Sequence, residues 1–227
     1  MGTPKNYQFD LPSSGRPSMF ELGDRFFPGI QTSWPRVTAR RMVHPIDGIR
    51  AVVIHATAGS SSSGAVSVMH AGTASFHWLV PGKNEEQHGH FAWACAPETL
   101  AAFHVRNDKS HPQVNGGERR VNHWSLGIEI VNTQNRQTPD PFSDWQVSIT
   151  ARIVRFCWAK YPNLKHIVSH ARLDPDRRTD PGANFPWEEF KQQVLNAEED
   201  PIPRLVARAG ARARNIEAAD IEGICTP

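Results

Sequence analysis

The stretch "IRAVVIHATAG", residues 49–59, decides the fold of this chain. Its centre is a continuous apolar run rich in β-branched residues, which leads to His55 and then to Gly59. A run of this kind is typical of a strand buried on both faces, as the central strands of α/β sheets are. The stretch therefore predicts a central strand that carries His55 near its end.

Composition places the chain among ordinary globular proteins. Its 227 residues are 39% hydrophobic and 21% charged, and a net charge of +2 favours no nucleic-acid partner. The three widely spaced cysteines form no CxxC motif, which argues against a disulfide framework and a cysteine zinc site. We find no apolar run as long as a membrane span and no signal-peptide pattern, so we expect cytoplasmic synthesis and no stable membrane insertion. The sequence leaves the oligomeric state open, and a monomer is the default expectation.

Strand and helix patterns alternate on both sides of the central run. Strands are predicted in residues 74–82, 124–132 and 166–170, with a weaker one in 86–93. Helices are predicted near residues 65–69, 143–161 and 186–197, and residues 97–105 favour a helix or a turn. This order predicts an α/β (α+β) fold, a sheet with helices packed on it.

The two ends of the chain differ from its middle. Residues 1–45 are rich in proline, glycine and serine and have little periodicity, which predicts an extended N-terminal arm. Residues 46–200 contain the strand and helix patterns and should form the main domain. Residues 201–227 contain several arginines and are interpreted as a basic C-terminal tail, helical over part of its length.

A second informative stretch is "HARLDPDRRTDPGANFPW", residues 170–187. Its two Asp-Pro steps exclude a long helix or a central strand, and polar loops of this length are either disordered or functional. It opens with His170 at the end of a predicted strand, and Asp180 follows ten residues later. With His55, these residues make two imidazoles and a carboxylate, a ligand set of catalytic zinc sites. Ordinary half-buried histidines remain the alternative.

The strand pattern "WSLGIEIVN", residues 124–132, contains a carboxylate between apolar residues. Leu126, Ile128 and Ile130 fall on one face of this strand and Glu129 on the other. Glu129 is explained either by the solvent face of an edge strand or by a cleft, where a carboxylate beside zinc would act as a general base.

Six short blocks, in order along residues 49–197, resemble the zinc-dependent N-acetylmuramoyl-L-alanine amidases of the type 2 family. They are "VVIHATAG", "SFHWLV", "AFHV", "SLGIEIVN", "IVSHARLDP" and "RRTDPGANFPW". The family includes phage lysozyme-amidases and peptidoglycan-recognition proteins. The resemblance implies a central mixed β-sheet flanked by helices and an amidase catalytic domain over residues 46–200. It also implies Zn²⁺ as cofactor, peptidoglycan or a muropeptide as substrate, and hydrolysis of the amide bond between N-acetylmuramic acid and L-alanine.

The resemblance also implies roles for single residues. His55, His170 and Asp180 match the zinc ligands, and Glu129 matches the residue that orients the attacking water and carries its proton. Arg178 stands where the family usually has a lysine that stabilises the oxyanion. Arginine keeps the positive charge but cannot release its proton, so it supports electrostatic stabilisation and not a role that needs a neutral amine.

Two further histidines match positions that line the substrate groove of the family. They are His77 in "SFHWLV" and His104 in "AFHV". The resemblance implies substrate binding, and a supporting or packing role remains equally open for each.

Two classes of function remain after these observations. A muramyl-amide hydrolase is favoured over a non-catalytic peptidoglycan-binding protein because all three matched ligand positions hold competent residues, although Arg178 favours the second class. Within the first class, the arm and tail favour a phage or prophage-type endolysin, a bacteriolytic enzyme acting on the cell wall from the periplasm. A cytoplasmic amidase that recycles anhydro-muropeptides is the alternative.

Overall fold

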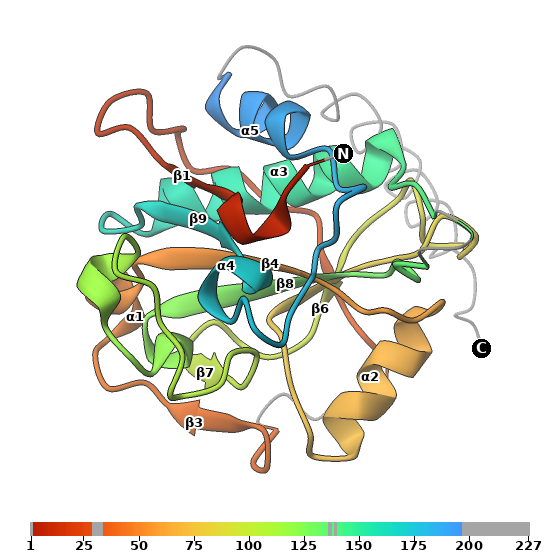
Figure 1. Ribbon diagram of the computed structural model, residues 1–227, viewed down its shortest axis with the longest axis horizontal. Helices are drawn as coiled ribbons and strands as arrows, with labels where there is room; N and C mark the ends of the chain where they lie inside the picture. Colours follow the sequence, from red (N-terminus) through yellow and green to blue (C-terminus); the bar gives the residue numbers. More distant parts are fainter. Residues whose placement is uncertain (1, 29–33, 136–137, 139, 197–227) are drawn as a thin grey trace, which may run out of the picture. The chain divides into compact units, whose positions relative to one another are not determined.

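A seven-stranded mixed sheet forms the centre of the protein, which confirms the predicted fold class (Figure 1). The computed structural model describes residues 2–28, 34–135, 138 and 140–196, so the predicted basic tail lies outside the described residues. The strand order is β1-β9-β4-β8-β5-β6-β2, and β3 and β7 form a separate two-stranded sheet. The strands are β1 (Gln8–Asp10), β2 (Arg25–Phe26), β3 (Thr38–Arg40), β4 (Ala51–Ala56), β5 (Trp78–Val80), β6 (Trp93–Ala94), β7 (Leu100–Ala102), β8 (Ser125–Ile130) and β9 (His166–Ser169).

Four central strands run parallel, and the edges of the sheet are mixed. β4 pairs in parallel with both β8 and β9, and β8 also pairs in parallel with β5. β1 is antiparallel to β9 and β6 is antiparallel to β5. The carboxyl ends of β4, β8 and β9 therefore meet at one edge of the sheet.

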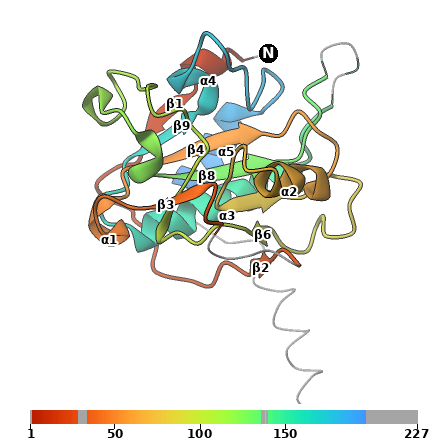
Figure 2. The same ribbon diagram turned by 90° about the horizontal axis from the view of Figure 1, so that it is seen from below.

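Helices lie on both sides of the sheet. They are α1 (Pro45–Gly48), α2 (Ser62–His70), α3 (Asp144–Lys160), α4 (His170–Leu173) and α5 (Trp187–Leu195), with 3-10 turns η1 (Pro4–Asn6), η2 (Asn115–Gly117) and η3 (Val121–His123). α3 and α5 pack together on one side, and α2 lies on the other (Figures 1 and 2). Among the described residues, none of the helices is long and apolar enough to cross a membrane.

The alternation of side chains in β8 decides which residues face the site. Leu126, Ile128 and Ile130 are fully buried in the core that contains α3 and α5. Because successive side chains of a strand point to opposite faces, Glu129 points away from that core. His55 pairs with Glu129 in the β4–β8 register, so the two side chains share a face of the sheet.

The predicted helix in residues 143–161 forms α3, and its start is encoded locally. The Ser143 side chain accepts a hydrogen bond from the Gln146 backbone N–H, and the Gln146 side chain accepts one from the Ser143 backbone N–H. This reciprocal capping box satisfies two backbone donors that a helix start leaves free.

Two of the weaker predictions are wrong. Residues 86–93 were expected to form a strand, but turns occupy 86–90 and the strand β6 begins only at Trp93. Residues 97–105 were expected to form a helix or a turn, but only 98–99 form a turn, and Leu100–Ala102 is strand β7, paired with β3. Local pattern does not reveal a three-residue strand whose partner lies some sixty residues earlier in the chain, because strand formation depends on that tertiary pairing.

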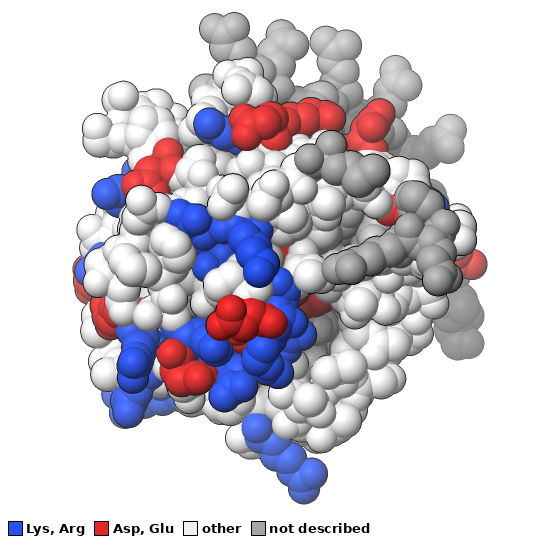
Figure 3. All heavy atoms as spheres, viewed as in Figure 1, with Lys and Arg blue, Asp and Glu red and all other residues white. Residues whose placement is uncertain are grey.

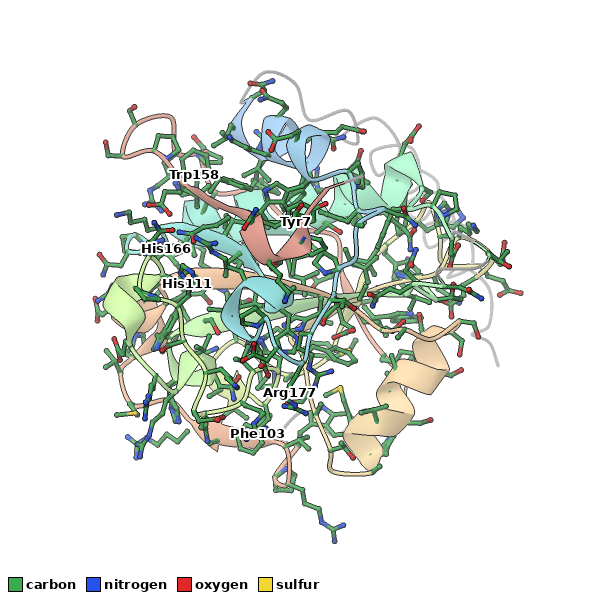
Figure 4. All side chains as sticks on the ribbon, viewed as in Figure 1. Tyr7, Phe103, His111, Trp158, His166 and Arg177 are labelled. Atoms are coloured by element: carbon green, nitrogen blue, oxygen red, sulfur yellow. The ribbon has the colours of Figure 1, made fainter. Side chains whose placement is uncertain are left out.

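The first 45 residues contribute three short strands. β1 extends the large sheet beside β9, β2 pairs with β6, and β3 pairs with β7. Tyr7, which is labelled in Figure 4 and precedes β1, stacks on Trp187 at the start of α5, and the ring centroids are 4.8 Å apart. The Ser169 hydroxyl donates to the carbonyl of Pro4, which attaches η1 to the segment that carries His170.

Candidate active site

The three predicted metal ligands converge at the carboxyl edge of the central strands. β4 carries His55, β9 ends directly before His170, and the loop after α4 returns Asp180 to the same point. His55 Nδ1 lies 3.0 Å from His170 Nδ1 and 3.2 Å from Asp180 Oδ2, and His170 Nδ1 lies 3.0 Å from the same oxygen. Ligands of α/β sheets commonly bind at this edge.

The residues fit a zinc ion on geometric and chemical grounds. Ligand atoms about 2.0–2.1 Å from a tetrahedral zinc lie about 3.3 Å from one another, close to the separations found here. The three side chains are all buried and belong to a group that could hold a metal ion. Two aromatic nitrogens and a carboxylate oxygen facing one point are a zinc donor set.

The protonation states of the ligands suit metal binding as well. Burial is the main cause that lowers the pKa of His55 to about 4, so its imidazole is neutral near pH 7. Burial alone would raise the pKa of Asp180, but the adjacent His170 and His55 side chains outweigh it and hold that pKa below its usual range. Neutral imidazole and charged carboxylate are the forms that bind metal ions.

Glu129 lies beside this cluster with a strongly perturbed carboxyl group. Burial raises its pKa well above the usual value, and the negative charge of Asp180 raises it further, while Arg178 partly opposes both. A carboxylate with a raised pKa takes up a proton more readily than an ordinary carboxylate, as a general base must.

Arg178 lies in the loop between α4 and α5. Its backbone N–H donates to the carbonyl of Asp174 at 2.9 Å, and its side chain is exposed. Its charge is close enough to lower the pKa of both Glu129 and His55. Arg178 also lines a cavity of about 490 Å³, together with Lys5 and other residues from the N-terminal segment and the loops after β8 and α4. The lining of this cavity includes Arg178 but not His55, His170 or Asp180.

His77 is buried, and its ring nitrogens contact two backbone groups and the Arg41 side chain. Nδ1 accepts a hydrogen bond from the Gly127 N–H at 2.9 Å, and Nε2 lies 3.0 Å from Arg41 Nη2 and 3.1 Å from the carbonyl oxygen of Leu100. Burial lowers its pKa to about 3. Of the two roles left open by the sequence, this arrangement fits packing better than contact with a substrate.

His104 is also buried, and it contacts the side of the His55 ring that faces away from His170 and Asp180. Its Nδ1 lies 3.0 Å from His55 Nε2, and its Nε2 lies 3.2 Å from Ser125 Oγ. This placement fits a supporting role for His104. Ser125 was not among the residues predicted from the sequence, although the alternation of "SLGIEI" already places it on the strand face of Glu129.

Comparison with known proteins agrees with this geometry. The family model described as N-acetylmuramoyl-L-alanine amidase matches residues 45–183, which is more than half of the chain. The chain belongs to this family. The match contains all three residues of the candidate metal cluster and Glu129.

Two curated relatives share part of the sequence. The N-acetylmuramoyl-L-alanine amidase AmiD of Escherichia coli is 29% identical over 156 residues, which cover 66% of this chain and 54% of AmiD. The 1,6-anhydro-N-acetylmuramyl-L-alanine amidase AmpD of Salmonella typhimurium is 34% identical over 79 residues, or 34% of this chain and 40% of AmpD. The chain thus matches about half of the length of these relatives.

Two solved structures resemble the fold. AmpDh3 from Pseudomonas aeruginosa has a TM-score of 0.58 at 22% identity, over 78% of this chain and 70% of AmpDh3. A complex of Escherichia coli AmiD with anhydro-N-acetylmuramic acid-L-Ala-D-γ-Glu-L-Lys has a TM-score of 0.56 at 27% identity, over 72% of this chain and 63% of AmiD. The family fold predicted from the sequence is therefore confirmed.

Proposed function

We propose that this chain is a zinc-dependent N-acetylmuramoyl-L-alanine amidase. The observation that carries the proposal is the convergence of one ligand atom each from His55, His170 and Asp180, at separations of 3.0–3.2 Å, in a member of this family. Two imidazoles and a carboxylate would hold the ion and leave room for water and substrate.

In this proposal, each residue beside the ion has a separate role in amide hydrolysis. A bound zinc supplies a Lewis acid that favours loss of a proton from water and polarises the amide carbonyl. Glu129 accepts the proton of the attacking water on its carboxylate and then donates it to the leaving amine nitrogen of L-alanine. The guanidinium group of Arg178 stabilises the negative charge that develops on the carbonyl oxygen.

We further propose that the substrate is a soluble anhydro-muropeptide, which revises the preference for an endolysin. The relatives that share the sequence are named as AmiD and AmpD amidases, and AmpD is named for 1,6-anhydro-N-acetylmuramyl-L-alanine. The AmiD complex contains an anhydro-muramyl tripeptide. These names support the recycling-type substrate better than polymeric wall.

Surface charge supports an acidic peptide as part of the substrate. In the view of Figure 3, lysine and arginine side chains gather over the region of α4 and the loops beside it. Arg177 and Arg178 in the loop after α4 are both exposed. A stem peptide carries carboxylates, and cations at the mouth of a cleft attract them.

The test compares two substrates with the purified full-length chain. Anhydro-muramyl tripeptide and intact sacculi are each digested with zinc, after chelation, and after zinc is restored, and released peptide with a free L-alanine amine is measured by mass spectrometry. We expect fast, zinc-dependent release from the soluble substrate and slow release from sacculi. His55→Ala should abolish release, whereas replacement of the exposed His90 by alanine should not change it.

Each other outcome contradicts a different part of the proposal. Undiminished hydrolysis after chelation would contradict the zinc site. Faster release from sacculi would contradict the soluble substrate and support an endolysin instead. Sacculus binding without any peptide release would make the protein a binding module.

A further inference from the structure

Three side chains, those of His55, His104 and Ser125, form a line of contacts that leads from the candidate metal cluster into the protein. His55 Nε2, on the side of the ring away from Asp180, lies 3.0 Å from His104 Nδ1. His104 Nε2 lies 3.2 Å from Ser125 Oγ, and the Ser125 hydroxyl donates to the carbonyl of Val121 at 2.7 Å. All these side chains are buried, so water does not compete for the hydrogen bonds.

The last member of the line fixes the direction of every hydrogen bond in it. A backbone carbonyl can only accept, so the single hydroxyl proton of Ser125 points to Val121. Ser125 Oγ must then accept from His104, which requires a proton on His104 Nε2. A neutral imidazole has one N–H, so His104 Nδ1 is an acceptor and receives the Nε2–H of His55. His55 Nδ1 is left with its lone pair directed toward His170 and Asp180.

The fold holds His104 in place through its backbone and through a glycine. Asn122 Oδ1 accepts hydrogen bonds from the backbone N–H groups of His104 and Val105, at 3.1 and 2.9 Å. The His104 ring lies against Gly127, where a Cβ atom would come within 2.8 Å of the ring carbon Cγ. The strand leaves this space only because residue 127 has no side chain.

We propose that His104 is a positioning residue that holds His55 in the tautomer with a free Nδ1, and that Ser125 sets the direction of the chain. The inference rests on the proposed zinc site and deepens it. The side chains that orient metal-bound histidines typically change metal affinity by about 10- to 100-fold when they are lost. The function of this line is therefore to make His55 a metal ligand before the ion arrives.

The test measures zinc affinity of the full-length chain by competition with a chromogenic chelator. We expect Ser125→Ala and His104→Ala to weaken zinc binding about 10- to 100-fold. His104→Asn should recover most of the affinity, since its side-chain oxygen can accept from His55. Ser75→Ala is the matched control because Ser75 is equally buried and its hydroxyl also donates to a backbone carbonyl, that of Val37.

Imidazole ¹⁵N NMR of the zinc-loaded chain gives an independent readout. We expect the proton of His104 on Nε2, and a proton on Nδ1 instead would overturn the proposal. Unchanged zinc affinity in Ser125→Ala would also overturn it, as would an equal loss in Ser75→Ala, which would indicate general loosening. If the unmodified chain binds no zinc, the proposed function fails as well, so the two failures are distinguishable.

Discussion

Replacement of Gly127 by alanine tests the position of His104 without removing any polar group. The added Cβ would lie 2.8 Å from His104 Cγ and 3.0 Å from Nδ1 and Cδ2. Carbon atoms do not approach so closely, so either the ring or strand β8 must shift. The ring is the freer of the two, because β8 is paired on both sides, with β4 and β5.

The expected magnitude follows from two opposing effects. Overpacking of a well-packed interior costs about 1–3 kcal/mol, and alanine in a strand recovers about 0.5–1 kcal/mol relative to glycine. The net loss of unfolding free energy is about 0–2.5 kcal/mol, which corresponds to a fall in Tm of up to about 10 °C for a unit of this size. A displaced ring also lengthens the 3.0 Å contact with His55, so zinc affinity should fall as well.

Thermal unfolding and zinc competition measure the two effects on the same preparations. Gly59→Ala serves as the control, because a Cβ there meets no atom closer than 3.7 Å and the change should stay within about 0.5 kcal/mol. A Gly127→Ala variant that keeps both the Tm and the zinc affinity of the unmodified chain would refute the packing of His104 on this strand.

Three further predictions concern the site and the fold. Since folding lowers the pKa of His77 from its ordinary 6.5 to about 3, stability is lost as pH falls below 6.5. Between pH 7.5 and 4.5 this group alone removes about 3 kcal/mol, and chelator-treated His77→Asn should show a correspondingly flatter pH dependence in denaturant titrations. Glu129→Gln should lower muropeptide hydrolysis about 10²- to 10⁴-fold while zinc content stays at the level of the unmodified chain. Ser143→Ala removes the cap of α3 and should cost about 1 kcal/mol by thermal unfolding without changing zinc affinity.

The central strands and the metal cluster could be predicted from the sequence because their signals are local. The apolar run before His55 and the alternation around Glu129 each define a strand, and "SH" and "TDPG" match His170 and Asp180 to ligand positions of the family that the sequence resembles. The short strand Leu100–Ala102 could not be predicted, because its strand state depends on pairing with β3. The same limit applies to the His104–Ser125 contact, which joins two segments that pattern alone does not bring together.

Because side chains alternate along β8, one face of this strand belongs to the core and the other belongs to the candidate site. One face carries three fully buried aliphatic side chains that pack in the core with α3 and α5. The other face carries Ser125, Gly127 and Glu129, which supply in turn the anchor of the hydrogen-bond chain, the space for the His104 ring and the proton carrier. A shift of register by one residue would turn the aliphatic side chains into the site and these three into the core. The free energy that buries the aliphatic face therefore also fixes the geometry of the site, and no separate interaction is needed to keep β8 in register beside His55.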